Sequence, residues 1–525
     1  ITDIREGAGF PVGEMSYDLV IIPGMETIRS TTLQRLEAFK KAGGRLIFLG
    51  NTPTYIDAEL GDRGRKLKDQ SECLGFERLP LLEALRGVRE LEIRDGSGGE
   101  RRDLLYQLRE EGPTRWLFIA HGDRPLNPDI PEASVIRIRL RGTWKASLYD
   151  TISGDITPLE TISGPARTEI FRTFYEHDSL LIRLDRGNPA PAASGKKEPA
   201  ESSGGLDGYN APALTLPQAR FIEPVPVTLH EPNVLLLDMA EYALNQEPFR
   251  PREEILRLDT LLRQELGWPL RMDAVAQPWV ESDTATPHIL HLRYTFESEL
   301  DLENTELALE NAGITRITLN SEGAGPVTGW YVDHCIQTVK LPRIKAGANT
   351  LCLSLPYGRK INVEALYLLG NFGVAVRGTR SVLTGPVRSL AFGDITRQGL
   401  PFYGGNLTYH LETERLEEGS EIAVTCYRGQ LLRVRADGED QGIIAYSPYR
   451  LALRGLNGSG PHRIDLEYFG SRINTFGQLH AVDRLPGHWW GPNSWRSMGT
   501  AWTYEYHFWP QGVLKSPELW CLAPN

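Results

Sequence analysis

Apolar runs alternate with amphipathic stretches in the first part of the chain. Tyr17–Pro23 has the pattern of a buried strand, and a second apolar run follows at Arg45–Leu49. Between them, Leu33, Leu36 and Phe39 recur at helical spacing. This alternation predicts an α/β domain with a doubly wound sheet over residues 1–125. The pattern lacks the strand and helix that normally open such a domain, so we expect it to be incomplete at its N-terminus.

Further segments of this region are assigned by the same periodicity. The expected elements are helices at Leu81–Val88 and Arg102–Glu110 and a strand at Trp116–Ala120. Residues 126–186 then change to short strands separated by turns, which predicts a small antiparallel β domain. Residues 187–208 are rich in Pro, Ala, Ser, Gly and Lys. Because such a composition cannot bury a core, we expect a flexible linker there.

The remainder of the chain is mostly β in pattern. Residues 209–285 form a connecting α/β segment, with a strand at Val234–Leu237 and a helix around Glu253–Leu266. Residues 286–525 carry two series of short strands with turn signals between them, beginning at His288–Phe296 and at Leu407–Leu411 and ending with a strand at Thr503–Phe508. They predict antiparallel β-sandwich or jelly-roll architecture, in one large module or two.

Composition excludes several classes of protein. The net charge of -11 argues against a nucleic-acid partner, which needs concentrated Lys and Arg. No run of 18 apolar residues occurs, so no membrane-spanning segment is expected. The five cysteines are scattered and form no CxxC pair, which is typical of reduced thiols and weakly favours the cytoplasm. Secretion stays open because the expected missing N-terminus would hide a signal peptide.

Several segments of the first 186 residues resemble known modules. Tyr17–Pro23, Leu33–Phe39, Gly43–Phe48 and Gly50–Pro53 resemble the amidotransferase-like, flavodoxin-like domain that follows the catalytic barrel in large bacterial glycoside hydrolases. Three further segments resemble a small β domain of the same enzymes: Trp144–Leu148, Gly154–Ile156 and Asp178–Leu184. Cys73 departs from the G-x-C-x-G elbow of a working amidotransferase, so amidase activity is not expected.

The C-terminal part resembles the galactose-binding-like jelly rolls of these enzymes. The likeness lies in Gly329–Asp333, Gly347–Leu351 and Gly470–Gly477. Glycoside hydrolase families 2 and 106 (α-L-rhamnosidase-like) are the families that these segments resemble most. The resemblance implies the accessory, C-terminal portion of a glycoside hydrolase, with the catalytic barrel as a partner and glycan as a ligand. No catalytic carboxylate of those families maps onto this sequence, so none is assigned.

Candidate catalytic and metal-binding groups are few. Glycoside hydrolysis needs two carboxylates, and the acidic pairs Asp238/Glu241 and Glu253/Glu254 are expected to be solvated structural groups. In a strand, His288 and His291 would point to opposite faces, so no metal ligand set is predicted. No cofactor is expected, although structural calcium stays open because its oxygen ligands leave no sequence signature.

Tryptophans near the C-terminus give the best binding signal. His488, Trp489, Trp490 and Trp495 lie in a segment with Gly and Pro but no strand period, which predicts a loop. Exposed indoles stack on the apolar faces of sugar rings, so these four residues are the candidate carbohydrate-binding site. The alternative is that the indoles pack in a core or against another domain.

Taken together, the resemblance implies the accessory part of a carbohydrate-active glycoside hydrolase that shapes an active-site rim, and the C-terminal tryptophans favour glycan binding. Two alternatives stay open. One is a standalone carbohydrate-binding or scaffolding protein without catalysis. The other is a complete enzyme whose site lies between these modules. A homo-oligomer also stays open.

Overall fold

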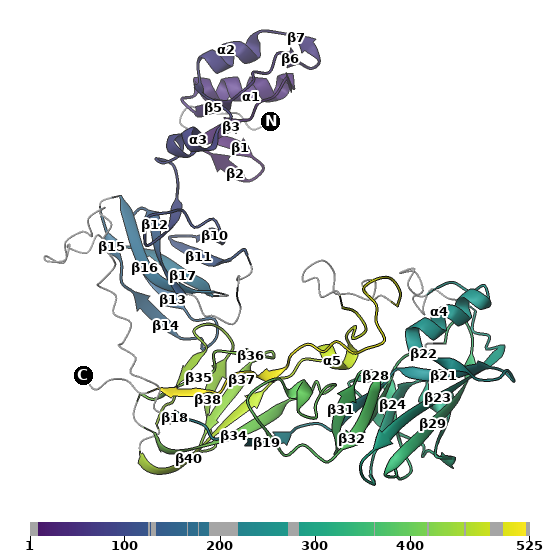
Figure 1. Cartoon of the computed structure of the whole chain (residues 1–525). Coiled ribbons are helices and arrows are strands. Elements are labelled where there is room, and N and C mark those ends of the chain that lie inside the picture. The colour runs from purple at the N-terminus through teal and green to yellow at the C-terminus, as the bar shows by residue number, and fades with distance from the viewer. Residues whose placement is uncertain are drawn as a thin grey trace.

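A computed structural model describes most of the chain. The described residues are 9–123, 127, 133–164, 166–176, 178–187, 219–270, 283–361, 363–416, 419–455, 458–482 and 497–520. They form one small α/β unit and three antiparallel sandwiches (Figure 1). The expected linker, apart from Gly187, lies outside them. No helix of the described ranges combines the length and the apolar character that crossing a bilayer requires.

The first unit is built on three parallel strands in the order β3-β5-β8. Leu33, Leu36 and Phe39 form the buried stripe of helix α1, as their spacing predicts. Its strands and helices are β1 (Phe10–Val12), β2 (Met15–Tyr17), β3 (Leu19–Ile22), β4 (Thr27–Ile28), α1 (Ser30–Lys41), β5 (Arg45–Leu49), β6 (Tyr55–Ile56), β7 (Glu59–Leu60), α2 (Arg63–Asp69), β8 (Glu72–Leu74) and α3 (Arg78–Ala84).

An amidotransferase-like domain is not supported by this unit. The strands follow one another in chain order, so the sheet has no reversal of strand order, which is where a doubly wound sheet binds its ligand. Cys73 lies within the short strand β8, and its exposed thiol donates to the carbonyl of Lys68 at 3.3 Å. The residue is therefore not on a strand-to-helix elbow.

A small sandwich follows, with sheets β10-β11-β17-β13-β14 and β15-β16-β12-β9. The helix predicted at Arg102–Glu110 is wrong, because this segment is strand β10 and pairs along its whole length with β11. Strands on both sides of residue 125 share one core. The strands are β9 (Leu91–Asp95), β10 (Leu104–Glu111), β11 (Thr114–His121), β12 (Ala133–Arg141), β13 (Trp144–Tyr149), β14 (Ile156–Leu159), β15 (Ile162–Ser163), β16 (Arg167–Tyr175) and β17 (Ser179–Arg186).

The second sandwich, here called the inner jelly roll, spans residues 233–384. Its two sheets enclose the largest core of the described chain. The predicted helix around Glu253–Leu266 is confirmed as α4, and the strand at His288–Phe296 as β23. The elements are β20 (Asn233–Leu237), β21 (Met239–Leu244), β22 (Arg250–Glu254), α4 (Ile255–Glu265), β23 (His288–Ser298), β24 (Glu306–Glu310), η1 (Ala312–Ile314), β25 (Arg316–Leu319), β26 (Glu322–Gly323), β27 (Val327–Tyr331), β28 (Asp333–Lys340), β29 (Gly347–Tyr357), β30 (Leu366–Gly370), β31 (Gly373–Arg377) and β32 (Arg380–Thr384).

The third sandwich, here called the outer sandwich, is assembled from both sides of the inner jelly roll. Strand β19 pairs with β33 and β34, so the inner jelly roll is an insertion within it. The elements are β18 (Ala219–Arg220), β19 (Val225–Leu229), β33 (Ser389–Leu390), η2 (Ile395–Arg397), β34 (Leu407–Leu416), β35 (Glu421–Ala423), β36 (Tyr427–Arg428), β37 (Leu432–Ala436), β38 (Glu439–Ile444), β39 (Arg450–Ala452), β40 (Gly458–Tyr468), α5 (Ile473–Phe476), β41 (Gly512–Val513) and β42 (Glu518–Trp520).

One stretch of chain joins the last two sandwiches. We call residues 473–482 and 497–511 the crossing segment; it leaves the outer sandwich after β40 and returns to it at β41 (Figure 1). Phe476, Leu479, Tyr506 and Phe508 of this segment pack against the core of the inner jelly roll. The strand predicted at Thr503–Phe508 is wrong, because these residues are irregular: two backbone bonds join them to His480 and Leu479, but no strand ladder forms.

Candidate functional site

The four predicted sugar-binding residues, His488, Trp489, Trp490 and Trp495, lie outside the described residues. Another tryptophan of the C-terminal group is described. Trp502 packs against His480 with ring centroids 5.8 Å apart, and the Arg257 guanidinium lies 4.2 Å from the centre of the Trp502 ring. This indole therefore has a packing role between the crossing segment and helix α4.

A buried polar cluster lies beneath the crossing segment. Asp238 and His480 are each only about a twentieth exposed, at 5% and 6%. Asp238 bonds His480 Nε2 at 3.1 Å and accepts the hydroxyl of Tyr506 at 2.5 Å. Burial alone would lower the pKa of His480, but the hydrogen bond and charge of Asp238 raise it. The cluster thus fixes the crossing segment to the edge of the inner jelly roll.

Glu254 adds a second carboxylate to this cluster. Its side chain caps helix α4 by accepting the backbone N–H groups of Leu256 and Arg257 at 3.1 and 3.0 Å. Burial and the nearby charge of Asp238 raise the pKa of Glu254 to about 7. The expectation that Asp238 and Glu254 are solvated is therefore wrong. Both carboxylates are buried where β21, β22 and the crossing segment meet.

The space beside these carboxylates is small. Asp238, Glu254 and His480 line a pocket of about 60 Å³. Ligand pockets usually measure about 300–1,000 Å³, so a sugar ring would not fit beside this pair. Two neighbouring carboxylates are a common feature of acid–base sites, but here the small volume of the pocket favours a structural role.

A larger cleft is lined in part by the crossing segment. Its volume is about 930 Å³, and its walls come from both sandwiches and from residues 505–508 of the crossing segment. Arg377, Arg388 and Arg397 line it together with Glu505 and Phe508. Tyr506 also lines this cleft while its hydroxyl reaches Asp238. The buried cluster therefore supports one wall of the cleft.

An exposed aromatic side chain lies on the hairpin of β27 and β28. Trp330 is 52% exposed, and its ring contacts that of His334 with centroids 4.3 Å apart and the ring planes tilted by 36°. Between the two strands Val332 has φ 61°, a left-handed conformation that β-branched residues rarely adopt. Strain of this kind persists only where the surroundings impose it, and it is common at functional sites.

The neighbouring Tyr331 holds this hairpin from below. Its side chain is buried, and its hydroxyl accepts a hydrogen bond from Arg472 at 3.2 Å. Arg472 also donates to both carboxylate oxygens of Glu231, at 2.6 and 2.7 Å. Trp330 is thus presented to solvent by a fixed backbone. In the sequence, Gly329–Asp333 indicates only a jelly-roll module, because the exposure of its tryptophan depends on the fold.

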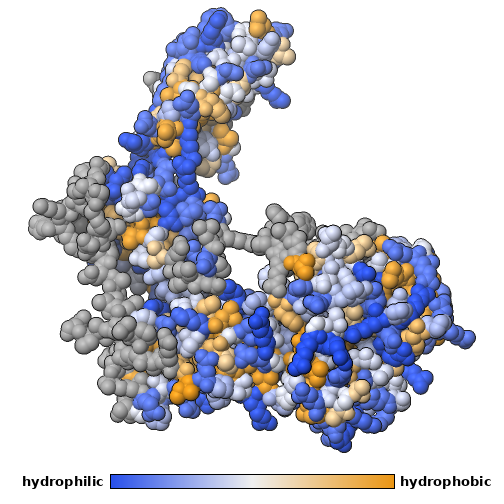
Figure 2. All heavy atoms as spheres, in the orientation of Figure 1, coloured by the Kyte–Doolittle hydropathy of each residue, from blue (hydrophilic) through white to orange (hydrophobic). Residues whose placement is uncertain are grey.

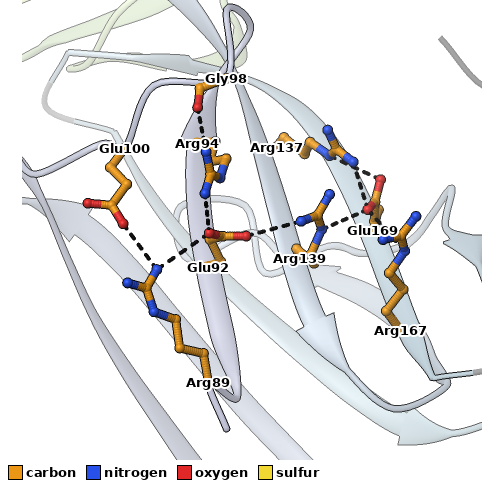
Figure 3. Close-up of polar contacts among 9 residues, drawn as sticks. All are labelled: Arg89, Glu92, Arg94, Gly98, Glu100, Arg137, Arg139, Arg167 and Glu169. Atoms are coloured by element: carbon orange, nitrogen blue, oxygen red, sulfur yellow. Dashed lines mark hydrogen bonds and ion pairs between the residues drawn. The ribbon is translucent and has the colours of Figure 1, made fainter. Parts of the chain in front are cut away.

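Ionic side chains cover one face of the small sandwich (Figure 3). Glu169, whose side chain is 7% exposed, accepts from Arg137 at 2.8 and 3.0 Å and from Arg139 at 2.9 Å. Arg139 also reaches Glu92 at 3.2 Å, which joins strands β9, β12 and β16. Because these arginines pair with carboxylates on neighbouring strands, the network stabilises the pairing of strands in the sheet.

The histidines considered as a metal pair have other partners. His288 bonds Asn245 at 3.1 Å, and His291 bonds Ser354 at 2.8 Å. Across the part of the chain that the structure describes, no three His, Cys, Asp or Glu side chains gather as a metal site. On the face drawn in Figure 2, apolar residues form small separate patches among hydrophilic ones.

Comparisons with known proteins give only distant structural likeness. No family model matches the chain, and no curated protein matches it. A rhamnosidase from Novosphingobium sp. PP1Y is similar with a TM-score of 0.43 and 10% identity, over 96% of this chain and 33% of that chain. An exo-carrageenase GH42 from Bacteroides ovatus has a TM-score of 0.22 and 9% identity, over 33% of this chain and 23% of that chain.

A third similar structure is a beta-D-mannosidase from Dictyoglomus thermophilum. Its TM-score is 0.18 and its identity 14%, over 46% of this chain and 31% of that chain. All three neighbours are glycoside hydrolases. The chain spans only about a third of the rhamnosidase and less of the other two. At these TM-scores the likeness carries no argument about activity.

Proposed function

We propose that this chain is the accessory β-sandwich part of a carbohydrate-active glycoside hydrolase and that it contacts glycan through Trp330. The observation that carries the proposal is the half-exposed indole of Trp330, which packs against the His334 ring beside the strained Val332. Sugar rings present apolar C–H faces, and a rigid aromatic ring binds such a face at little cost in conformational entropy.

The test is glycan binding by the whole chain, measured by isothermal titration calorimetry against neutral oligosaccharides that include rhamnosides and galactosides. Trp330→Ala should weaken binding about tenfold or more, because a central aromatic contact often contributes over 1 kcal/mol. Phe76→Ala is the matched control, since Phe76 is an aromatic residue 73% exposed on the α/β unit. Binding that is unchanged in Trp330→Ala contradicts the proposal.

The predicted site at His488, Trp489, Trp490 and Trp495 stays a proposal based on the sequence alone. Trp490→Ala in the same titration tests it separately, since its effect should add to that of Trp330→Ala if the two sites are independent.

A complete enzyme is the rival function, and the buried pair Asp238 and Glu254 is the observation that would favour it. We expect no turnover of aryl glycosides by the chain, because the adjoining pocket of about 60 Å³ is too small for a sugar. Turnover that disappears in Glu254→Gln would establish the rival instead.

A further inference from the structure

The cleft between the two C-terminal sandwiches has a charge opposite to that of the whole chain. The chain has a net charge of -11, yet three exposed arginines line this cleft. Arg377 ends strand β31, Arg388 precedes β33, and Arg397 ends η2. The three guanidinium groups thus come from separate elements that the fold brings to one opening.

These arginines are available to a ligand. Among the described residues, the side chains of Arg377 and Arg388 take part in no hydrogen bond or ion pair. Arg397 is 88% exposed and approaches Asp394 only at 3.9 Å. Exposed arginines elsewhere are paired more closely, as in the 2.5 Å contact between Arg380 and Glu297. The cleft therefore holds two arginines without an ion-pair partner among the described residues and a third with only a distant one.

Two carboxylates line the same cleft, and neither neutralises it. Asp394 caps η2 and is already engaged, since its Oδ1 accepts the backbone N–H groups of Thr396 at 3.0 Å and Gln511 at 3.2 Å. Glu505 lies on the crossing segment with its carboxylate near Gly378, and it makes no ion pair among the described residues. The cationic groups therefore outnumber the free carboxylates.

We propose that this cleft binds an acidic saccharide, whose carboxylate or sulfate groups pair with Arg377, Arg388 and Arg397. The volume of about 930 Å³ suits an oligosaccharide of a few rings. Guanidinium groups bind planar carboxylates and sulfate oxygens through paired hydrogen bonds. Phe508 supplies an apolar surface beside them. No residue of the β27–β28 hairpin lines the cleft, so this is a second site that goes beyond the proposed function.

The experiment titrates the whole chain with three probes by calorimetry at low and moderate salt. They are an oligogalacturonate, the same oligosaccharide fully methyl-esterified, and a sulfated galactan oligosaccharide. The acidic probes should bind, and the esterified probe should bind at least about tenfold more weakly. Added salt should weaken binding of the acidic probes, because the arginines are exposed. The stronger of the two acidic probes identifies carboxylate or sulfate as the preferred group.

The variant Arg377→Gln/Arg388→Gln should reduce binding of the acidic probe about tenfold or more. Its matched control is Arg343→Gln/Arg380→Gln, which removes two exposed arginines that pair with Asp301 and Glu297 outside the cleft. Equal binding of the acidic and esterified probes, equal loss in both variants, or no binding of either acidic probe would overturn the proposal. Loss of neutral-glycan binding in Trp330→Ala tests the proposed function independently of all three outcomes.

Discussion

The hydroxyl of Tyr506 donates a hydrogen bond of 2.5 Å to Asp238, which lies 268 residues earlier in the chain. Asp238 lies between strands β20 and β21 of the inner jelly roll, whereas Tyr506 belongs to the crossing segment that forms a wall of the arginine-lined cleft. One buried contact thus links the interior of the inner jelly roll to the shape of a surface cleft.

Tyr506→Phe should lower the free energy of unfolding by about 1–3 kcal/mol, because Asp238 is buried and loses one of its partners. Urea unfolding measures the change. Tyr504→Phe is the control, since Tyr504 is 41% exposed and its hydroxyl bonds the carboxylate of Glu253 at 3.0 Å. An equal loss of unfolding free energy in both variants would mean that the buried Tyr506–Asp238 bond stabilises the fold no more than the exposed Tyr504–Glu253 bond does.

Stability should fall as pH rises from about 5 to 8 through the cluster around Glu254. The pKa of Glu254 is raised to about 7 from a usual 4.5. Its contribution is therefore complete below the unfolded pKa and is lost as pH rises through 7, by up to about 3 kcal/mol. The raised pKa of His480 acts in the same direction, because its contribution is present below its unfolded pKa of 6.5 and is lost at higher pH.

Glu254→Gln should flatten this pH dependence when unfolding free energies are compared at pH 5, 7 and 8. Glu253→Gln changes the adjacent carboxylate, which pairs with Arg257 at 2.9 Å, and should keep the slope. If the dependence of unfolding free energy on pH persisted in Glu254→Gln and disappeared in Glu253→Gln, Glu253 and not Glu254 would be the titrating group.

Val332→Asn should raise the free energy of unfolding by about 1 kcal/mol, because Asn tolerates the left-handed conformation that Val332 adopts at φ 61°. Thermal unfolding is the measurement. Val327→Asn on the same hairpin is the control, since Val327 is 42% exposed and lies in a strand with ordinary backbone angles. We expect no gain there, and a loss of stability in Val332→Asn would show that its backbone is not strained.

Glu169→Gln should destabilise the small sandwich by about 2 kcal/mol, because Arg137 and Arg139 lose their shared buried carboxylate. Burial opposes ionisation of Glu169, but hydrogen bonds from these arginines hold its pKa below 4.5. Its contribution is therefore present above the unfolded pKa and is lost as pH falls through the folded pKa. Hydrogen exchange of β12 and β16 at pH 3 and 6 measures this, with the 61% exposed Glu110→Gln as control.

Local pattern predicted the elements whose burial follows their own sequence. Helix α1 has its apolar stripe at Leu33, Leu36 and Phe39, and β23 alternates buried and exposed positions. The segment Arg102–Glu110 was predicted as a helix because Leu104, Leu105 and Leu108 have helical spacing. Pairing with β11 overrides that preference, and only Leu104 of β10 is buried.

The sites depended on contacts that no local pattern contains. The sequence predicts that Asp238 and Glu254 are solvated. The partners that cover Asp238, His480 and Tyr506, lie 242 and 268 residues further along the chain, so no local pattern reveals its burial. The sequence contains Trp330 but does not predict that it is exposed, because its exposure follows from the β27–β28 turn. The arginines of the cleft are separated by up to 20 positions and by changes of sandwich, so the sequence gives no sign that they converge.

The insertion of the inner jelly roll sets an order for synthesis and folding. Thr228 of β19 meets His410 of β34, which emerges from the ribosome 182 residues later. Until then β19 has no ladder partner on that side, while the inner jelly roll between them can already fold and bring the two ends together. A folded insertion shortens the effective loop that the outer sandwich must close, and so lowers the entropy cost of its longest-range pairing. Slow or faulty folding of the inner jelly roll would therefore delay the outer sandwich as well.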